Sequence, residues 1–179
     1  MIFSGESGEV KREGALFLDG INRLSPEDDC LIVYGHNMKN GTMFGRLDEL
    51  GQLNNLKANA LVRFDTVYEN HSYLPFAAFT ASMDKNSDRY FEVRRFLMTP
   101  EEFEEFAGEL KRRSRFEIPV DVGYGDDILL LVTCDYSNTD GRFILALRKL
   151  RPGETEETEI GYISHFATCP NASRHRKKR

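Results

Sequence analysis

The sequence predicts a mainly β protein with one inserted α-helix, arranged as a β-barrel or a sandwich. Short apolar runs bounded by turn residues recur along the chain, a pattern typical of β-strands. Only one segment, which begins at Thr99, carries both start and stop signals of a well-defined helix. Because helices do not alternate with the strands, repeated β-α-β units are not expected.

The segments before this helix are mostly strand-like. Residues 15–19 form a short apolar run, and residues 30–34 form a β-branched run that ends at a glycine. Residues 44–56 place an apolar residue at every third position and predict a short helix. Residues 60–69 and 72–81 predict a hairpin around Asn70-His71.

The predicted helix starts at a strong local signal. Thr99 is a good capping residue, Pro100 suits the first helical position, and two glutamates follow. Apolar residues recur on one face, and Lys111-Arg112-Arg113 suit the C-terminal end.

The segments after the helix predict a second hairpin. Residues 128–133 are an apolar run of buried-strand length, residues 138–141 have turn chemistry, and residues 142–150 form the returning strand. We therefore assign residues 1–151 to one folded domain and residues 152–179 to a charged C-terminal tail.

Composition excludes several functional classes. Of the 179 residues, 40% are hydrophobic and 30% are charged, which is typical of a folded domain and not of a disordered chain. Five of the 24 basic residues lie in the last six positions, so the rest of the chain has 19 basic and 29 acidic residues. Such an acidic body argues against nucleic acid as a partner. No apolar stretch reaches membrane-spanning length, and the N-terminus has no apolar signal-peptide core.

Metal sites and disulfides are not predicted either. The three cysteines are too few and too scattered for a disulfide framework or a zinc site. The acidic residues at 84–88 lack the alternating oxygen ligands and the closing glutamate of a calcium loop.

Three residues form a chemically coherent set. His36 follows one predicted strand, Cys134 ends another, and Arg142 begins the strand that returns beside Cys134 after a short turn. A thiol beside a cationic imidazole has a lowered pKa and becomes a thiolate nucleophile. The imidazole can exchange protons with a leaving or an entering amine, and a guanidinium can stabilise an oxyanion.

Each of these residues also has a purely structural interpretation. A cysteine at the end of an apolar strand is often a small buried side chain. A histidine in a Gly-Asn turn is often simply solvated, and an arginine that opens a strand often protects a sheet edge. Cys30 is expected in the core, and no role is assigned to Cys169, His71, His165 or His175.

Several stretches in order resemble class B sortases, which are cysteine transpeptidases of Gram-positive cell surfaces. The block Tyr34-Gly35-His36-Asn37-Met38 and the pair Thr133-Cys134, with Arg142 eight residues after the cysteine, are the most specific matches. The helix inserted between the predicted strands 72–81 and 128–133 is similar to class B and not to class A. The matching stretches are residues 14–19, 31–38, 43–47, 99–115, 120–122 and 128–142, within about residues 5–150.

The resemblance implies a sortase-like β-barrel and a reaction. Cys134 would attack the threonine carbonyl of a Pro-x-Thr-type C-terminal sorting signal and form a thioacyl enzyme. His36 would act as general acid and base, and Arg142 would orient the substrate or stabilise the oxyanion. An amine of a peptidoglycan cross-bridge or of a pilin would then resolve the thioester.

The resemblance also implies a substrate surface and a cellular location. Tyr34, Val132 and Asp135 would lie near the substrate, and no cofactor is implied. Val132 occupies a position where a hydroxyl residue is expected. Such enzymes act on the outer face of the membrane, whereas this sequence is expected to lack both the membrane anchor and the first two barrel strands.

Two other functions follow from the same residues. One is a catalytically idle sortase-like domain that binds peptides, which is suggested by the expected missing strands. The other is an unrelated cysteine hydrolase that uses water as the acceptor, because hydrolysis and transfer share the thioacyl stage.

Overall fold

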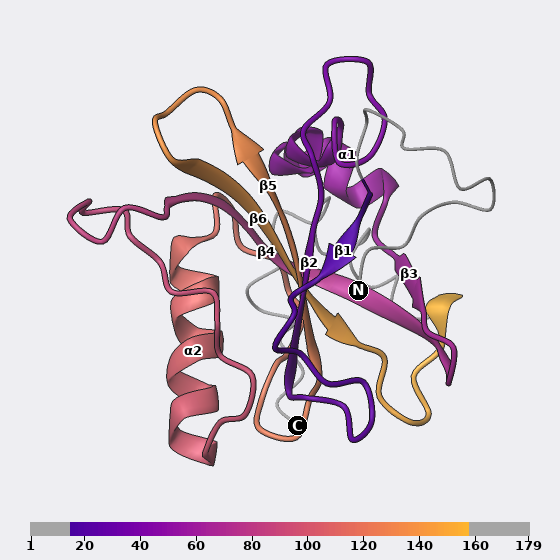
Figure 1. The fold of residues 1–179 in the computed structure, drawn as a ribbon. Helices are drawn as coiled ribbons and strands as arrows, with labels where there is room; N and C mark the ends of the chain where they lie inside the picture. Colours follow the sequence, from indigo (N-terminus) through magenta and orange to yellow (C-terminus); the bar gives the residue numbers. More distant parts are fainter. Residues whose placement is uncertain (1–14, 158–179) are drawn as a thin grey trace.

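The computed structural model describes residues 15–157, which form one curved sheet with helices packed around it (Figure 1). Along the chain the elements are β1 (Phe17–Leu18), β2 (Cys30–Tyr34), the 3₁₀ helix η1 (Leu47–Gly51), α1 (Leu53–Ala58), β3 (Val62–Asp65), β4 (Asn70–Ser82), α2 (Pro100–Arg113), β5 (Ile128–Asp135) and β6 (Gly141–Lys149). The prediction of a mainly β fold with one long inserted helix is confirmed.

The six strands form a half-barrel sheet in the order β1-β2-β5-β6-β4-β3. All neighbouring pairs are antiparallel except β2 and β5, which run parallel. This parallel pair brings together segments almost one hundred residues apart, and it makes the C-terminal ends of β2 and β5 neighbours at one end of the sheet.

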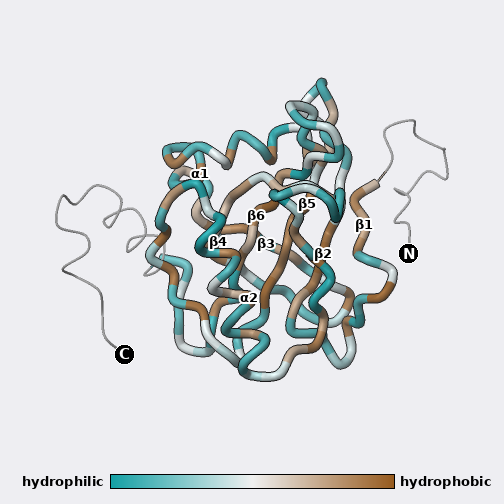
Figure 2. Tube along the Cα trace, turned by 90° about the vertical axis from the view of Figure 1, so that its left-hand side faces the viewer, coloured by the Kyte–Doolittle hydropathy of each residue, from teal (hydrophilic) through white to brown (hydrophobic). Residues whose placement is uncertain are grey.

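The central strands are apolar along almost their whole length. β2 and β5 read CLIVY and ILLLVTCD, and nearly all of their residues are buried. Such runs are expected where both faces of a sheet are covered. Figure 2 shows the apolar residues concentrated along these central strands, whereas the outer loops are mainly hydrophilic.

The helix α2 covers one face of the sheet and is fixed by local signals at its start. The Thr99 hydroxyl accepts a hydrogen bond from the Glu102 amide at 3.3 Å, and the Glu102 carboxylate accepts one from the Thr99 amide at 2.9 Å. This capping box satisfies two amides that the helix itself leaves unpaired. The helix buries four side chains, Phe103, Phe106, Ala107 and Leu110.

Two predicted elements differ in detail. The segment 44–56, predicted as one short helix, is divided into η1 and α1. The first hairpin turns at residues 66–69 and not at Asn70-His71, because the Thr66 hydroxyl accepts hydrogen bonds from the amides of Tyr68 and Glu69. His71 therefore lies in β4 and pairs with Phe64.

The first residues of the predicted tail are held against the sheet. Glu154 forms a buried ion pair with Arg148 of β6 at 2.8 Å. Glu156 accepts a hydrogen bond from Ser72 at 2.7 Å and pairs with Arg63. The stretch up to Glu157 thus packs as part of the fold, while Cys169, His165 and His175 lie outside the described residues.

Within residues 15–157, no helix combines the length and the apolar character needed to cross a membrane.

Candidate functional site

The β5–β6 hairpin brings Cys134 and Arg142 together. The two residues are direct partners in the antiparallel register, as the turn length predicted. Residues opposite each other in such a pair project to the same face, with Cβ atoms about 4.5–5.5 Å apart. Both side chains are half-buried, so they remain open to a ligand.

The face on which these residues lie follows from the register. Phe79, Ile144, Val132 and Tyr34 form one row across four neighbouring strands. Phe79 contacts Phe91, which stacks on Phe106 of α2. Because side chains two residues apart share a face, Cys134 and Arg142 lie on the α2 side of the sheet.

The tight turn between β5 and β6 is organised by Asp135. Its carboxylate accepts hydrogen bonds from the Ser137 amide at 3.0 Å, from the Ser137 hydroxyl at 2.6 Å and from Asn138. Burial opposes ionisation of Asp135, but these hydrogen bonds outweigh it and lower the pKa of the carboxyl group. Asp135 therefore acts in the turn that sets the Cys134–Arg142 register.

His36 stands at the base of a small loop that follows β2. The Phe44 amide donates to the His36 carbonyl at 3.0 Å, and Asn37 forms an antiparallel bridge with Met43. A side chain at Gly45 would collide with the Met38 carbonyl oxygen, so only glycine fits where the loop closes. The His36 side chain is exposed.

Three hydrogen bonds hold this loop to the end of β5. The Gly35 amide donates to the Val132 carbonyl at 3.1 Å, and the Thr133 hydroxyl donates to the Gly35 carbonyl at 2.8 Å. The Asn37 amide group donates to the Cys134 carbonyl at 2.8 Å. Continuing the Tyr34–Val132 register by two residues brings His36 to the level of Cys134.

The sequence alone indicates no role for Asn37 or Thr133, whose side chains hold the His36 loop to β5. Both belong to the blocks that resemble sortases, but nothing in their spacing indicates that they bond to the opposite segment. Their partners lie 97 and 98 residues away along the chain.

The structure places Tyr34 beside this site and Val132 inside the core. The Tyr34 hydroxyl donates to Asp19 at 3.1 Å, and its ring stacks on Phe17. Val132 is only 1% exposed. The Val132 side chain therefore packs among apolar neighbours, and the expectation that this residue lies near the substrate stays a prediction.

The two cysteines of the described region differ in their surroundings. Cys30 is fully buried, and burial together with the nearby Asp29 and Asp28 carboxylates raises the pKa of its thiol far above the ordinary value. Cys134 is half-buried at the strand end. Of these two thiols, only Cys134 is placed for nucleophilic chemistry.

Residues 15–157 contain no group of three or more histidine, cysteine or acidic side chains arranged to hold a metal ion. A thiol, an imidazole and a guanidinium are groups that can together support acyl transfer through a covalent intermediate.

Comparison with known proteins identifies the family. A family model of the Sortase domain matches residues 1–149. Sortase B of Staphylococcus aureus (strain NCTC 8325 / PS 47) is 27% identical over 145 residues, which are 80% of this chain and 57% of that protein. Sortase B of Listeria monocytogenes serovar 1/2a is 31% identical over 127 residues, which are 71% of this chain and 50% of that protein.

The fold agrees with these matches. A solved structure of Staphylococcus aureus sortase B has a TM-score of 0.67 and 26% identity, covering 79% of this chain and 64% of that chain. The chain spans about half the length of the two curated relatives that it matches. The family match and the class B relatives together show that the chain belongs to the sortase family, and within it to class B.

Proposed function

We propose that this chain is a cysteine transpeptidase that cleaves a Pro-x-Thr-type sorting signal and transfers the threonine acyl group to an amine. The observation that carries the proposal is the register pairing of Cys134 with Arg142, next to the loop that holds His36. The Staphylococcus aureus sortase B structure is a complex with a substrate, and sortase B has also been solved in complex with triglycine. These complexes support a peptide substrate and an amine acceptor.

In the first step, the Cys134 thiolate attacks the threonine carbonyl carbon of the signal peptide. The carbonyl electron pair moves onto oxygen, and the Arg142 guanidinium stabilises that negative charge. The tetrahedral intermediate collapses, the C–N bond breaks, and the His36 imidazolium gives its proton to the leaving amine. A thioester on Cys134 remains.

In the second step, an acceptor amine attacks the thioester carbon and gives a proton to neutral His36. The C–S bond breaks, Cys134 leaves as thiolate, and a new amide joins the surface protein to the acceptor. We propose an amine of a peptidoglycan cross-bridge or of a pilin as this acceptor, at the outer face of the membrane or in the cell wall. Tyr34 and Asp135 are proposed to border the substrate.

Incubation with a Pro-x-Thr peptide, with and without triglycine, tests the proposal. Mass spectrometry should detect cleavage after threonine and a product ligated to triglycine. The Cys134→Ala variant should give neither, whereas Cys30→Ala should retain both because Cys30 is buried away from the site. Cleavage without ligation would instead support a hydrolase. No cleavage, or retained cleavage in Cys134→Ala, would overturn the proposal, and the former would support the idle peptide-binding domain.

A further inference from the structure

A buried carboxylate joins three segments close to the proposed reactive face. Asp19, which follows β1, is only 3% exposed. One carboxylate oxygen accepts hydrogen bonds from the Tyr34 hydroxyl at 3.1 Å and from the Arg94 Nε at 3.0 Å. The other oxygen accepts one from the Ile21 amide at 3.1 Å. Three donors therefore satisfy the hydrogen-bonding capacity of this buried carboxylate.

Arg94 belongs to the long connection between β4 and α2. Phe91 and Val93 of this connection insert into the core, whereas the Arg94 side chain is 56% exposed and reaches back to Asp19. The ion pair links residues 75 positions apart. It therefore fixes the connection against the ends of β1 and β2.

Tyr34 ties this junction to the candidate site. It pairs with Val132, and Cys134 lies two residues further along the same face of β5. Its ring stacks on Phe17 with centroids 5.3 Å apart, and Phe17 is 41% exposed. Burial, followed by the charge of Asp19, raises the pKa of Tyr34 to about 12, so the hydroxyl stays neutral and bonded to the carboxylate.

We propose that Asp19 and Arg94 are positioning residues, which hold the Tyr34 ring and the β4–α2 connection in the arrangement that accepts the signal peptide beside Cys134. This role rests on the proposed transpeptidase function. Neither residue contacts the reacting atoms. Losing the ion pair should therefore weaken peptide binding while leaving the chemistry of the thiol unchanged.

The chain contains a matched control for this ion pair. Arg23 and Asp28 form a pair of the same kind at the opposite end of β2, also at 3.0 Å. The side chains are 52% and 1% exposed there, against 56% and 2% for Arg94 and Asp19. Arg94→Gln and Arg23→Gln thus remove equivalent interactions at different distances from Cys134.

The test measures peptide turnover, alkylation of Cys134 by iodoacetamide and hydrogen exchange in the intact chain. For Arg94→Gln, we expect KM for the peptide to rise about tenfold with kcat changed less than about twofold, the signature of lost binding. The alkylation rate should not change, and backbone exchange of residues 91–98 should accelerate. Arg94→Lys, which keeps the charge, should restore most of the affinity, and Arg23→Gln should resemble the wild type.

An Arg94→Gln variant with unchanged KM and unchanged exchange would overturn this role, provided that the wild type turns over the peptide. Equal increases in KM for Arg94→Gln and Arg23→Gln would also overturn it, because they would indicate a general loss of stability. A wild type without turnover would instead overturn the proposed function, and this role with it.

Discussion

The His36 loop is held at the end of β5 by side chains that take no part in the proposed bond making. The Asn37 amide group donates to the Cys134 carbonyl, and the Thr133 hydroxyl donates to the Gly35 carbonyl. Each bond can therefore be removed by a substitution at Asn37 or Thr133 that leaves the residues Cys134, His36 and Arg142 themselves unsubstituted. The two substitutions separate the positioning of the imidazole from its chemistry.

Replacing Asn37 by alanine should lower peptide kcat/KM about tenfold, because a net hydrogen bond of about 1 kcal/mol is lost where small displacements matter for catalysis. Steady-state kinetics with the Pro-x-Thr peptide measures this effect. Asn55→Ala is the matched control, since the Asn55 amide group donates to the Glu49 carbonyl at 3.1 Å, a bond that joins α1 to η1 and not the His36 loop to β5. An Asn37→Ala variant with wild-type kinetics would contradict the positioning role.

Replacing Thr133 by valine should reduce the free energy of unfolding by about 1–3 kcal/mol, because the Gly35 carbonyl loses its donor next to a buried side chain. Thr133 is 2% exposed, so water cannot easily replace the hydroxyl. Urea denaturation of the variant and the wild type gives the difference. A change smaller than the experimental error would show that the bond does not stabilise the fold.

At this scale, the sequence predicted the pairing of Cys134 with Arg142 because both residues flank one short turn. It did not predict the Asn37 and Thr133 hydrogen bonds or the Asp19–Arg94 pair. Those contacts join residues 75 to 98 positions apart, and they depend on the parallel pairing of β2 with β5 and on the path of the β4–α2 connection. Local patterns contain no information on either.

At the scale of elements, α2 was predicted well because its signals are local. Thr99, Pro100 and Glu102 define the start, and the helix runs from Pro100 to Arg113. The hairpin turn at 66–69 was misplaced, because Thr66 forms a side-chain turn that competes with the more obvious Asn70-His71 pair.

Replacing Thr99 by alanine should destabilise the protein by about 1 kcal/mol, the usual cost of losing an N-terminal helix cap. Peptide kcat/KM should stay at the wild-type value, because the start of α2 lies at the other end of β2 from His36: the Met98 amide donates to the Asp29 carboxylate at 2.9 Å, just before β2 begins. Thermal denaturation and steady-state kinetics on the same sample check both statements. A loss of activity with unchanged stability would be inconsistent with a purely structural role for this cap.

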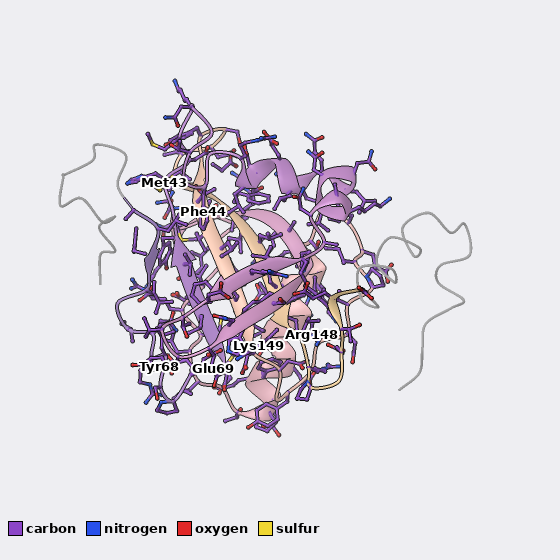
Figure 3. The ribbon with its side chains drawn as sticks, turned by 90° about the vertical axis from the view of Figure 1, so that its right-hand side faces the viewer. Met43, Phe44, Tyr68, Glu69, Arg148 and Lys149 are labelled. Atoms are coloured by element: carbon purple, nitrogen blue, oxygen red, sulfur yellow. The ribbon has the colours of Figure 1, made fainter. Side chains whose placement is uncertain are left out.

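At the scale of the whole molecule, the proposed reactive residues and the ion pairs that hold the chain after β6 lie at opposite ends of the sheet. Figure 3 shows Met43 and Phe44, from the His36 loop, at the upper end, and Arg148 and Lys149 at the lower end. At the lower end, Arg148 pairs with Glu154 and Arg151 pairs with Asp126 at 2.6 Å. These pairs hold the chain after β6 against the rest of the fold, and Glu154 lies in the segment that was predicted as a charged tail.

The Arg148–Glu154 pair should make stability depend on pH. Burial opposes ionisation of Glu154, but hydrogen bonds from Arg148 and from the Arg151 amide outweigh it and lower the pKa of this carboxyl group below its ordinary 4.5. A lowered folded-state pKa stabilises the protein above pH 4.5, and this contribution is lost as the pH falls through the folded-state value.

Urea denaturation at pH 6 and at pH 3.5 tests this dependence. Glu154→Gln should reduce the unfolding free energy at pH 6 by about 3 kcal/mol, the range for breaking a buried pair, and should lose less stability on acidification than the wild type. Glu49→Gln, which removes an exposed pair with Arg46, should remain close to the wild type at pH 6. Equal acid sensitivity of Glu154→Gln and the wild type would contradict the assignment.

The most direct test of the account is the intact mass of the protein after brief mixing with a Pro-x-Thr peptide, followed by acid quenching and peptide mapping. The account predicts an added mass equal to the acyl fragment ending in threonine, located on Cys134 and absent from Cys134→Ala. It also predicts that the adduct disappears when an amine acceptor is added. Peptide cleavage without an adduct on Cys134, or an adduct on another residue, would contradict the central claim.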